Sequence, residues 1–161
     1  MDRQSTQDRA RIRALLLQSR AGAGEHLAAI RSARPLDEET LRRELREYIL
    51  CKYMLQGVDC GTDNFNALTE LSLARSMKVS KDLVEEFDTA KSCDGATSAM
   101  AKKVLLMMNL EKELDIQIPA GPAAKDITLE ELISLIWDTM TRSPNWSGRL
   151  AAAEHLAQAG S

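Results

Sequence analysis

Apolar side chains recur every three or four residues along most of the chain, which is the spacing of one face of an α-helix. The most regular stretch predicts a helix that begins after Thr128 and runs to about residue 140. Thr128 and Glu131 have the spacing of a capping box, in which two side chains bind backbone N–H groups at the start of a helix. The apolar positions of this helix are Leu129, Leu132, Ile133, Ile136 and Met140.

The middle of the chain contains three more stretches with helical spacing. The first begins near Asp37 and ends at about residue 55. The second follows a loop, has Asp63 or Asn64 as its N-terminal cap, and is expected to fray near Met77. The third is a short helix over 80–87.

The N-terminal segment is predicted to form two helices, over about 6–20 and 25–33, because the sequence AGAG at 21–24 interrupts the pattern. Pro35 then ends the second helix, since proline disfavours helical geometry in the residue before it. At the other end of the chain, residues 149–159 are rich in alanine and predict a terminal helix.

A loop with the sequence SCDGATS, at 92–98, precedes a strongly helical pattern at 99–114. After this helix, Ile116 and Ile118 alternate with polar residues as in a short buried extended segment, and Pro119 stops the helical pattern. No stretch has the length and alternation of a convincing β-strand. The pattern as a whole therefore predicts an all-α protein.

Charge is distributed unevenly along the chain. Residues 1–55 carry a net charge of +3, and residues 56–161 carry −6. The basic residues of the first part alternate with acidic ones and few aromatic side chains lie nearby, so the sequence does not favour nucleic-acid binding. A solvated helix surface is the expected role of these charges.

The sequence contains no apolar run of 18 residues, so no transmembrane helix is expected. The first twenty residues lack the apolar core and cleavage site of a secretory signal. The three cysteines have irregular spacing, which is typical of reduced thiols and not of a disulfide framework or a zinc site. We therefore expect a cytoplasmic protein.

Catalytic and cofactor motifs are poorly represented. The two histidines, His26 and His155, lie far apart in Ala-rich segments, so neither forms an evident dyad with a cysteine or a serine. No set of His, Cys and acidic residues has the spacing of metal ligands, and the glycines do not form a phosphate-binding loop. The sequence therefore predicts a protein that is not an enzyme and has no metal site.

Three motifs, LEKELDIQIP, AAKDIT and TLEELISLI, occur in this order in the second half of the chain. Similar motifs end one helix, form a short helix and begin a last helix in acyl and peptidyl carrier proteins, which this chain therefore resembles, mainly over 104–137. The resemblance implies a four-helix carrier-like bundle at 57–141. Residues 1–56 would then be a basic N-terminal helical extension, and 142–161 a C-terminal tail helix.

Carriers hold their cargo on a serine at the N-terminus of the second helix, where helix N–H groups favour the phosphodiester of a 4′-phosphopantetheine arm. The resemblance implies that Ser98 is this attachment site and that it carries an acyl or aminoacyl thioester. The serine of the family usually stands in Asp-Ser-Leu, whereas Ala and Met follow Ser98. The alternative is that Thr97 or Ser98 only caps the helix.

Cys93, in the same loop, is a second candidate. It precedes a predicted helix N-terminus and lies near lysines, which are conditions that lower a thiol pKa. One alternative hypothesis is therefore a Cys93-dependent carrier; its similarity to Cys-containing helical segments beside cysteine desulfurases implies a sulfur-transfer partner of that type. The alternative is an ordinary small loop residue.

Under either hypothesis, the helix at 99–114 would dock to a partner enzyme of a biosynthetic or group-transfer pathway. Met100, Lys102, Lys103 and Met107 are the predicted docking residues. The lysines differ from the acidic second helix that carriers usually present to basic enzymes. A third hypothesis is therefore a degenerate carrier fold that acts only as an interaction or scaffold module.

Overall fold

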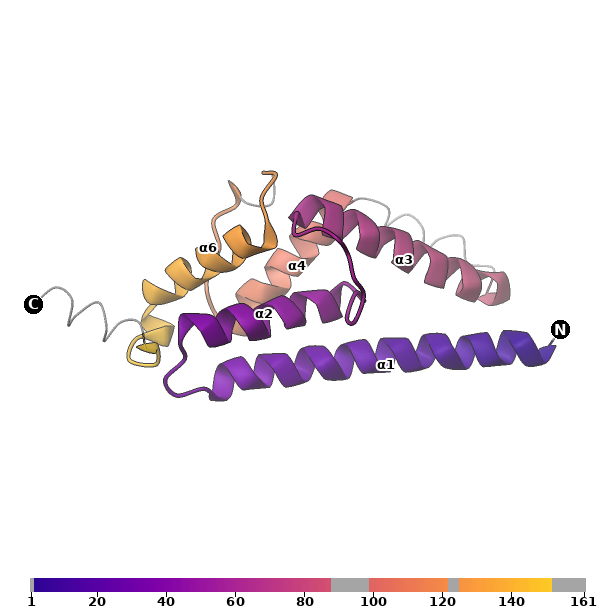
Figure 1. Ribbon diagram of the computed structural model, residues 1–161, viewed down its shortest axis with the longest axis horizontal. Helices are drawn as coiled ribbons and strands as arrows, with labels where there is room; N and C mark the ends of the chain where they lie inside the picture. Colours follow the sequence, from indigo (N-terminus) through magenta and orange to yellow (C-terminus); the bar gives the residue numbers. More distant parts are fainter. Residues whose placement is uncertain (1, 88–98, 122–124, 152–161) are drawn as a thin grey trace, which may run out of the picture.

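The computed structural model describes residues 2–87, 99–121 and 125–151, and within these ranges all regular structure is helical (Figure 1). The prediction of an all-α protein is therefore confirmed. No helix in these ranges is long and apolar enough to cross a membrane. The elements are α1 (Asp2–Ser32), α2 (Glu38–Lys52), α3 (Phe65–Phe87), α4 (Ala99–Leu114), α6 (Leu129–Thr141) and the 3₁₀ turn η2 (Pro144–Trp146).

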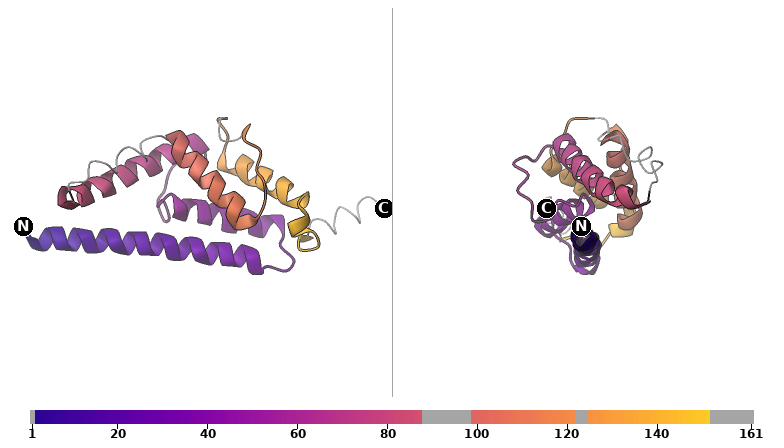
Figure 2. Two further views of the ribbon diagram at one scale, coloured as in Figure 1. Left: turned by 180° about the vertical axis from the view of Figure 1, so that it is seen from behind. Right: turned by 90° about the vertical axis from the view of Figure 1, so that its right-hand side faces the viewer.

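Helix α1 is continuous, so the predicted break at 21–24 is wrong. α1 and α2 lie side by side (Figure 1, Figure 2), and a Cβ atom at Gly22 would lie only 2.9 Å from Cys51 Sγ. Glycine destabilises a helix interior by about 1 kcal/mol relative to alanine, but here it allows the two helices to approach closely. The sequence AGAG therefore marks a helix contact and not a helix end.

Helix α2 begins as predicted, because the Asp37 carboxylate accepts a hydrogen bond from the Thr40 backbone N–H at 2.6 Å. Hydrogen bonds at Thr40 also lower the pKa of Asp37. The helix ends at Lys52, slightly before the predicted end at about residue 55. The helical spacing of its apolar residues gives α2 one buried side, which consists of Leu41, Leu45, Tyr48, Ile49 and Cys51.

The loops before α3 and α6 meet in an isolated antiparallel bridge between Asn64 and Thr128. The Leu129 N–H donates to the Asp63 carbonyl at 2.7 Å in this bridge. Asn64 is the residue that caps α3, because its Oδ1 accepts from the Ala67 N–H at 2.9 Å. The bridge places the N-termini of α3 and α6 next to each other.

The capping box predicted for α6 is confirmed. Thr128 Oγ1 accepts from the Glu131 N–H at 3.0 Å, and Glu131 Oε1 accepts from the Thr128 N–H at 3.3 Å. Arg46 of α2 binds both Asp63 (2.6 Å) and Glu130 (3.0 Å), which ties α2 to the start of α6. The buried residues of α6 are Leu129, Leu132, Ile133, Ile136, Trp137 and Met140.

Helix α3 runs without interruption to Phe87, so the predicted fraying near Met77 and the separate helix over 80–87 are wrong. No glycine or proline lies between residues 70 and 87, so nothing in the backbone chemistry ends the helix there. The C-terminal half of α3 extends away from α2, α4 and α6 (Figure 1), and Met77 is exposed.

One cluster of buried apolar side chains includes residues of α1, α2, α4 and α6. Ile30, Leu45, Leu110 and Ile136 are fully buried members from these four helices. Residues 1–56 therefore contribute to the same core as the region predicted to be carrier-like, and they are not an appendage to it.

The segment after α6 also returns to the core. Trp146 is buried, and its Nε1 donates to the Leu114 carbonyl at the end of α4 at 2.7 Å. Leu150 is buried and bridges Leu36. The predicted extended segment after α4 is likewise buried at Ile116 and Ile118. The terminal helix predicted over 149–159 does not begin at 149, because Arg149 lies in a turn and Leu150 in the bridge to Leu36, and residues from 152 on lie outside the described residues.

Candidate functional site

Helix α4 has the bounds predicted from the sequence, and it presents two contrasting sides. Its inner side packs into the core. Its outer side exposes four large apolar residues, which we call the α4 apolar face. These are Met100 (48% exposed), Val104 (40%), Leu105 (57%) and Met108 (58%).

The spacing of the α4 apolar face makes it a continuous stripe. Met100, Val104 and Met108 follow one another at i, i+4 and i+8, so they form one row along the helix, and Leu105 lies beside this row. Single exposed apolar residues are normal on protein surfaces, whereas a contiguous group marks an interaction site. The outer side of α4 therefore has the composition of a contact surface.

Lys103 was predicted to be a docking residue, but it lies on the inner side of α4. It is only 3% exposed, its Nζ lies 2.5 Å from Asn66 Oδ1, and the ammonium sits 5.3 Å from the centre of the Phe65 ring. Burial lowers the pKa of Lys103, with the nearby Asp126 acting in the opposite direction. The ammonium therefore holds α4 against the start of α3 and does not face a partner.

Lys102 is half-buried and has a similar arrangement one residue earlier. Its Nζ donates to Ser76 Oγ at 2.9 Å and lies 5.8 Å from the centre of the Tyr53 ring. Burial lowers the pKa of Lys102. The rings of Tyr53 and Phe65 stack on each other, with their centroids 6.2 Å apart. Adjacent lysines thus contact a stacked aromatic pair, and both contribute to the packing of α4 on its neighbours.

The other predicted site residues are divided between the surface, the core and the undescribed part of the chain. Met100 is exposed, as a docking residue must be, while Met107 is only 6% exposed and belongs to the core. Ser98 and Cys93 lie outside the described residues, although Ala99, the first residue of α4, directly follows Ser98 in the sequence.

Sequence reasoning did not identify Val104, Leu105 and Met108 as surface residues. A signal was nevertheless present, because α4 contains more large apolar residues than one helix face can bury. A helix that is apolar on most sides is either buried all round or has a second contact surface. Only the structure shows that the second case applies.

The histidines and acidic residues do not assemble into a reaction centre in the described ranges. His26 Nδ1 lies 2.6 Å from Glu44 Oε2, which joins α1 to α2. The contact with His26 is the main cause of a lowered pKa at Glu44. No group of three or more His, Cys, Asp or Glu side chains within these ranges could hold a metal ion. His155 lies outside the described residues.

Comparisons of the chain with protein-family models, with curated proteins and with solved structures found no match. The likeness to carrier proteins therefore rests on the residues quoted above, and it stays a prediction.

Proposed function

We propose that this protein is a non-enzymatic helical module that docks to a partner protein through the α4 apolar face. The observation that carries the proposal is the row of Met100, Val104 and Met108, with Leu105 beside it, on the solvent side of a helix whose other side is fixed in the core. Methionine side chains are flexible and polarisable, and they suit contact with an apolar groove. A rigid helix with anchors at i, i+4 and i+8 matches the helix-in-groove mode of recognition.

The charges beside the stripe indicate the chemistry of the partner. Lys112 is exposed one turn beyond Met108, and it forms no ion pair with any residue that the structure describes. Within α4 the two acidic residues, Glu111 and Glu113, are half-buried, whereas Lys112 is exposed. We therefore expect the partner to present an apolar groove with acidic side chains at its rim.

Site-specific photo-cross-linking tests this proposal. The photoreactive amino acid p-benzoylphenylalanine replaces Leu105 in one variant and the exposed Glu39 of α2 in a control variant. We expect the Leu105 variant to cross-link to a different protein in cells and the Glu39 variant to give no such product. The cross-linked protein is then purified, and its dissociation constant for the unmodified chain is measured.

Two substitutions connect that affinity to the stripe. Val104→Glu places a charge in the apolar contact and should weaken binding at least about tenfold, because an unpaired charge would be desolvated there. Lys112→Glu should slow association, with a smaller effect at high salt. If the Leu105 variant forms only cross-linked dimers, or if Val104→Glu binds like the unmodified chain, the proposal is wrong.

A second candidate function is the carrier role. Its support is the position of Ala99 at the start of α4, because the partial positive charge and free N–H groups at a helix N-terminus favour a phosphodiester on the preceding residue, Ser98. Incubation with a phosphopantetheinyl transferase and coenzyme A should then add the mass of one phosphopantetheine arm. Ser98→Ala should abolish the addition. An unmodified intact mass, or labelling that persists in Ser98→Ala, would eliminate this candidate.

A further inference from the structure

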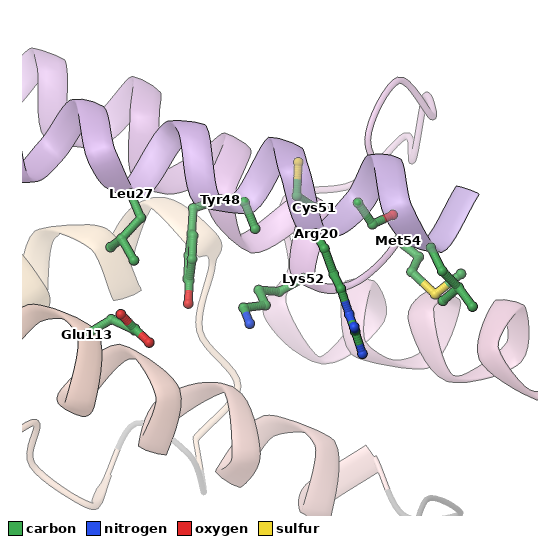
Figure 3. A pocket seen from close by; sticks show the side chains of 11 residues that line it. Arg20, Leu27, Tyr48, Cys51, Lys52, Met54 and Glu113 are labelled. Carbon is green, nitrogen blue, oxygen red and sulfur yellow. The ribbon is translucent and has the colours of Figure 1, made fainter. Parts of the chain in front are cut away.

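A cavity of about 390 Å³ lies between α1, α2 and the end of α4 (Figure 3). This volume is in the range of small-molecule sites. Leu16 and Leu27 of α1 provide apolar walls, and Tyr48 and Lys52 of α2 provide polar groups. Arg20 and Glu113 complete the set of charged side chains around it.

Tyr48 carries the strongest indication of a ligand. Its side chain is only 1% exposed, and its hydroxyl has no hydrogen-bond partner among the residues that the structure describes. Figure 3 shows the ring extending from α2 across the cavity toward α4, with the hydroxyl on the side of Glu113 and Lys52. Buried hydroxyls nearly always have a partner, because removing one from water without compensation is unfavourable. A bound molecule would supply the missing acceptor.

The charges around the cavity favour an anion. Arg20 and Lys52 are exposed at its rim and form no ion pair with any described residue, while the Lys52 ammonium lies 5.8 Å from the centre of the Tyr48 ring. Glu113 is the one acidic side chain in the lining, and Arg31 already neutralises it through a 2.8 Å ion pair. Among the residues that line the cavity, the unpaired charges are therefore positive, although burial, together with Glu47 and Glu25 outside the lining, raises the pKa of the Cys51 thiol.

Tyr48 is also suited to act as a donor. Burial, together with the charge of Glu113, raises the pKa of Tyr48 to about 12, so the phenol keeps its proton at neutral pH. A protonated phenol donates a hydrogen bond to a carboxylate, whereas a phenolate would repel it.

We propose that this cavity binds a small organic carboxylate, with its charged group held by Tyr48, Lys52 and Arg20 and its apolar part against Leu16 and Leu27. The proposal is independent of docking through α4. It assigns to the protein a ligand site between the N-terminal helices and the rest of the core.

Titration of the full-length ¹⁵N-labelled protein with sodium octanoate tests the site by NMR, with 1-octanol and octylamine as neutral and cationic probes of the same chain length. Octanoate should shift the amide resonances of residues that line the cavity. Octanol and octylamine should bind at least about tenfold more weakly, because they lack a charge that pairs with the two cations.

Three variants locate the binding groups. Tyr48→Phe removes only the hydroxyl and should weaken octanoate binding by roughly tenfold. The double variant Arg20→Gln, Lys52→Gln should abolish the preference for octanoate over octanol. Arg13→Gln removes an exposed arginine two turns earlier on α1 and serves as the control, with unchanged binding expected.

Either of two results would overturn the proposal. The first is equal binding of octanoate and octanol by the unmodified chain, or shifts at residues away from the cavity. The second is unchanged octanoate affinity in Tyr48→Phe and in the double variant. Thermal unfolding of each variant separates these outcomes from misfolding, and Tyr48→Phe should be at least as stable as the unmodified chain because it removes an unsatisfied hydroxyl.

Discussion

Helices α6 and α4 are both rich in large apolar residues, but the fold uses them differently. Seven large apolar residues belong to α6: six are buried, and Leu135 is partly buried against the same core. In α4 four large apolar residues stay on the solvent side, while a lysine occupies the inner side. The pattern of α6 is thus fully explained by folding. The outer side of α4 is not, and it is the part of the molecule where a functional explanation is needed.

The largest expected effect is a difference between two substitutions, one in each helix, in how far they lower the free energy of unfolding of the protein. Ile136→Ala should lower the free energy of unfolding by about 2–5 kcal/mol, because Ile136 is fully buried and its truncation leaves a cavity. Met108→Ala should change it by no more than about 0.5 kcal/mol, since the side chain is exposed.

Urea unfolding of both variants measures this contrast. A loss of 2 kcal/mol or more in Met108→Ala, within the range expected for a core truncation, would show that the outer side of α4 stabilises the fold. The contrast between the helices would then disappear, together with the main support for docking.

The next largest effect concerns the start of α6. Thr128→Ala removes the hydroxyl that accepts from the Glu131 N–H, and it should lower the free energy of unfolding by about 1 kcal/mol. Thr141→Ala is a matched control near the other end of the helix, where the hydroxyl is exposed and donates to the Asp138 carbonyl. Equal effects of the two substitutions in urea unfolding would mean that the capping box does not stabilise α6.

The sequence predicts α6 almost completely because the information is local. The capping residues lie three positions apart, and a single apolar stripe faces a single core. The prediction of a break at 21–24 was wrong because the information there is not local. The role of Gly22 depends on Cys51, which is 29 residues away in the sequence and reaches Gly22 only when α1 and α2 pack together.

The candidate site was predictable only in part. The sequence indicates the bounds of α4 and its excess of apolar residues, but not which of Met107 and Met108 faces the core. The sequence also predicts that the Lys103 side chain is exposed, because lysines are almost always exposed, and this is wrong. Its burial requires Asn66 and Phe65, which belong to another helix. The cavity beside Tyr48 depends on three helices and has no local sequence signal.

The smallest expected effect tests the inner side of α4 through pH. Burial holds the pKa of Lys103 below its ordinary value of 10.5, so the unfolded chain binds this proton more tightly than the folded protein does. Stability therefore rises with pH between the folded-state pKa and about 10.5, as the folded lysine loses its buried charge first.

Lys103→Met keeps the apolar stem and lacks the titrating group. The free energy of unfolding of the unmodified chain, minus that of Lys103→Met, should therefore increase from pH 7 to pH 10. Other titrating groups, including Tyr48 and Tyr53, cancel in this difference because both proteins contain them. A difference that is flat or falls over this range would mean that the Lys103 ammonium is solvated. The inner side of α4 would then lack the buried charged contact that distinguishes it from the inner side of α6.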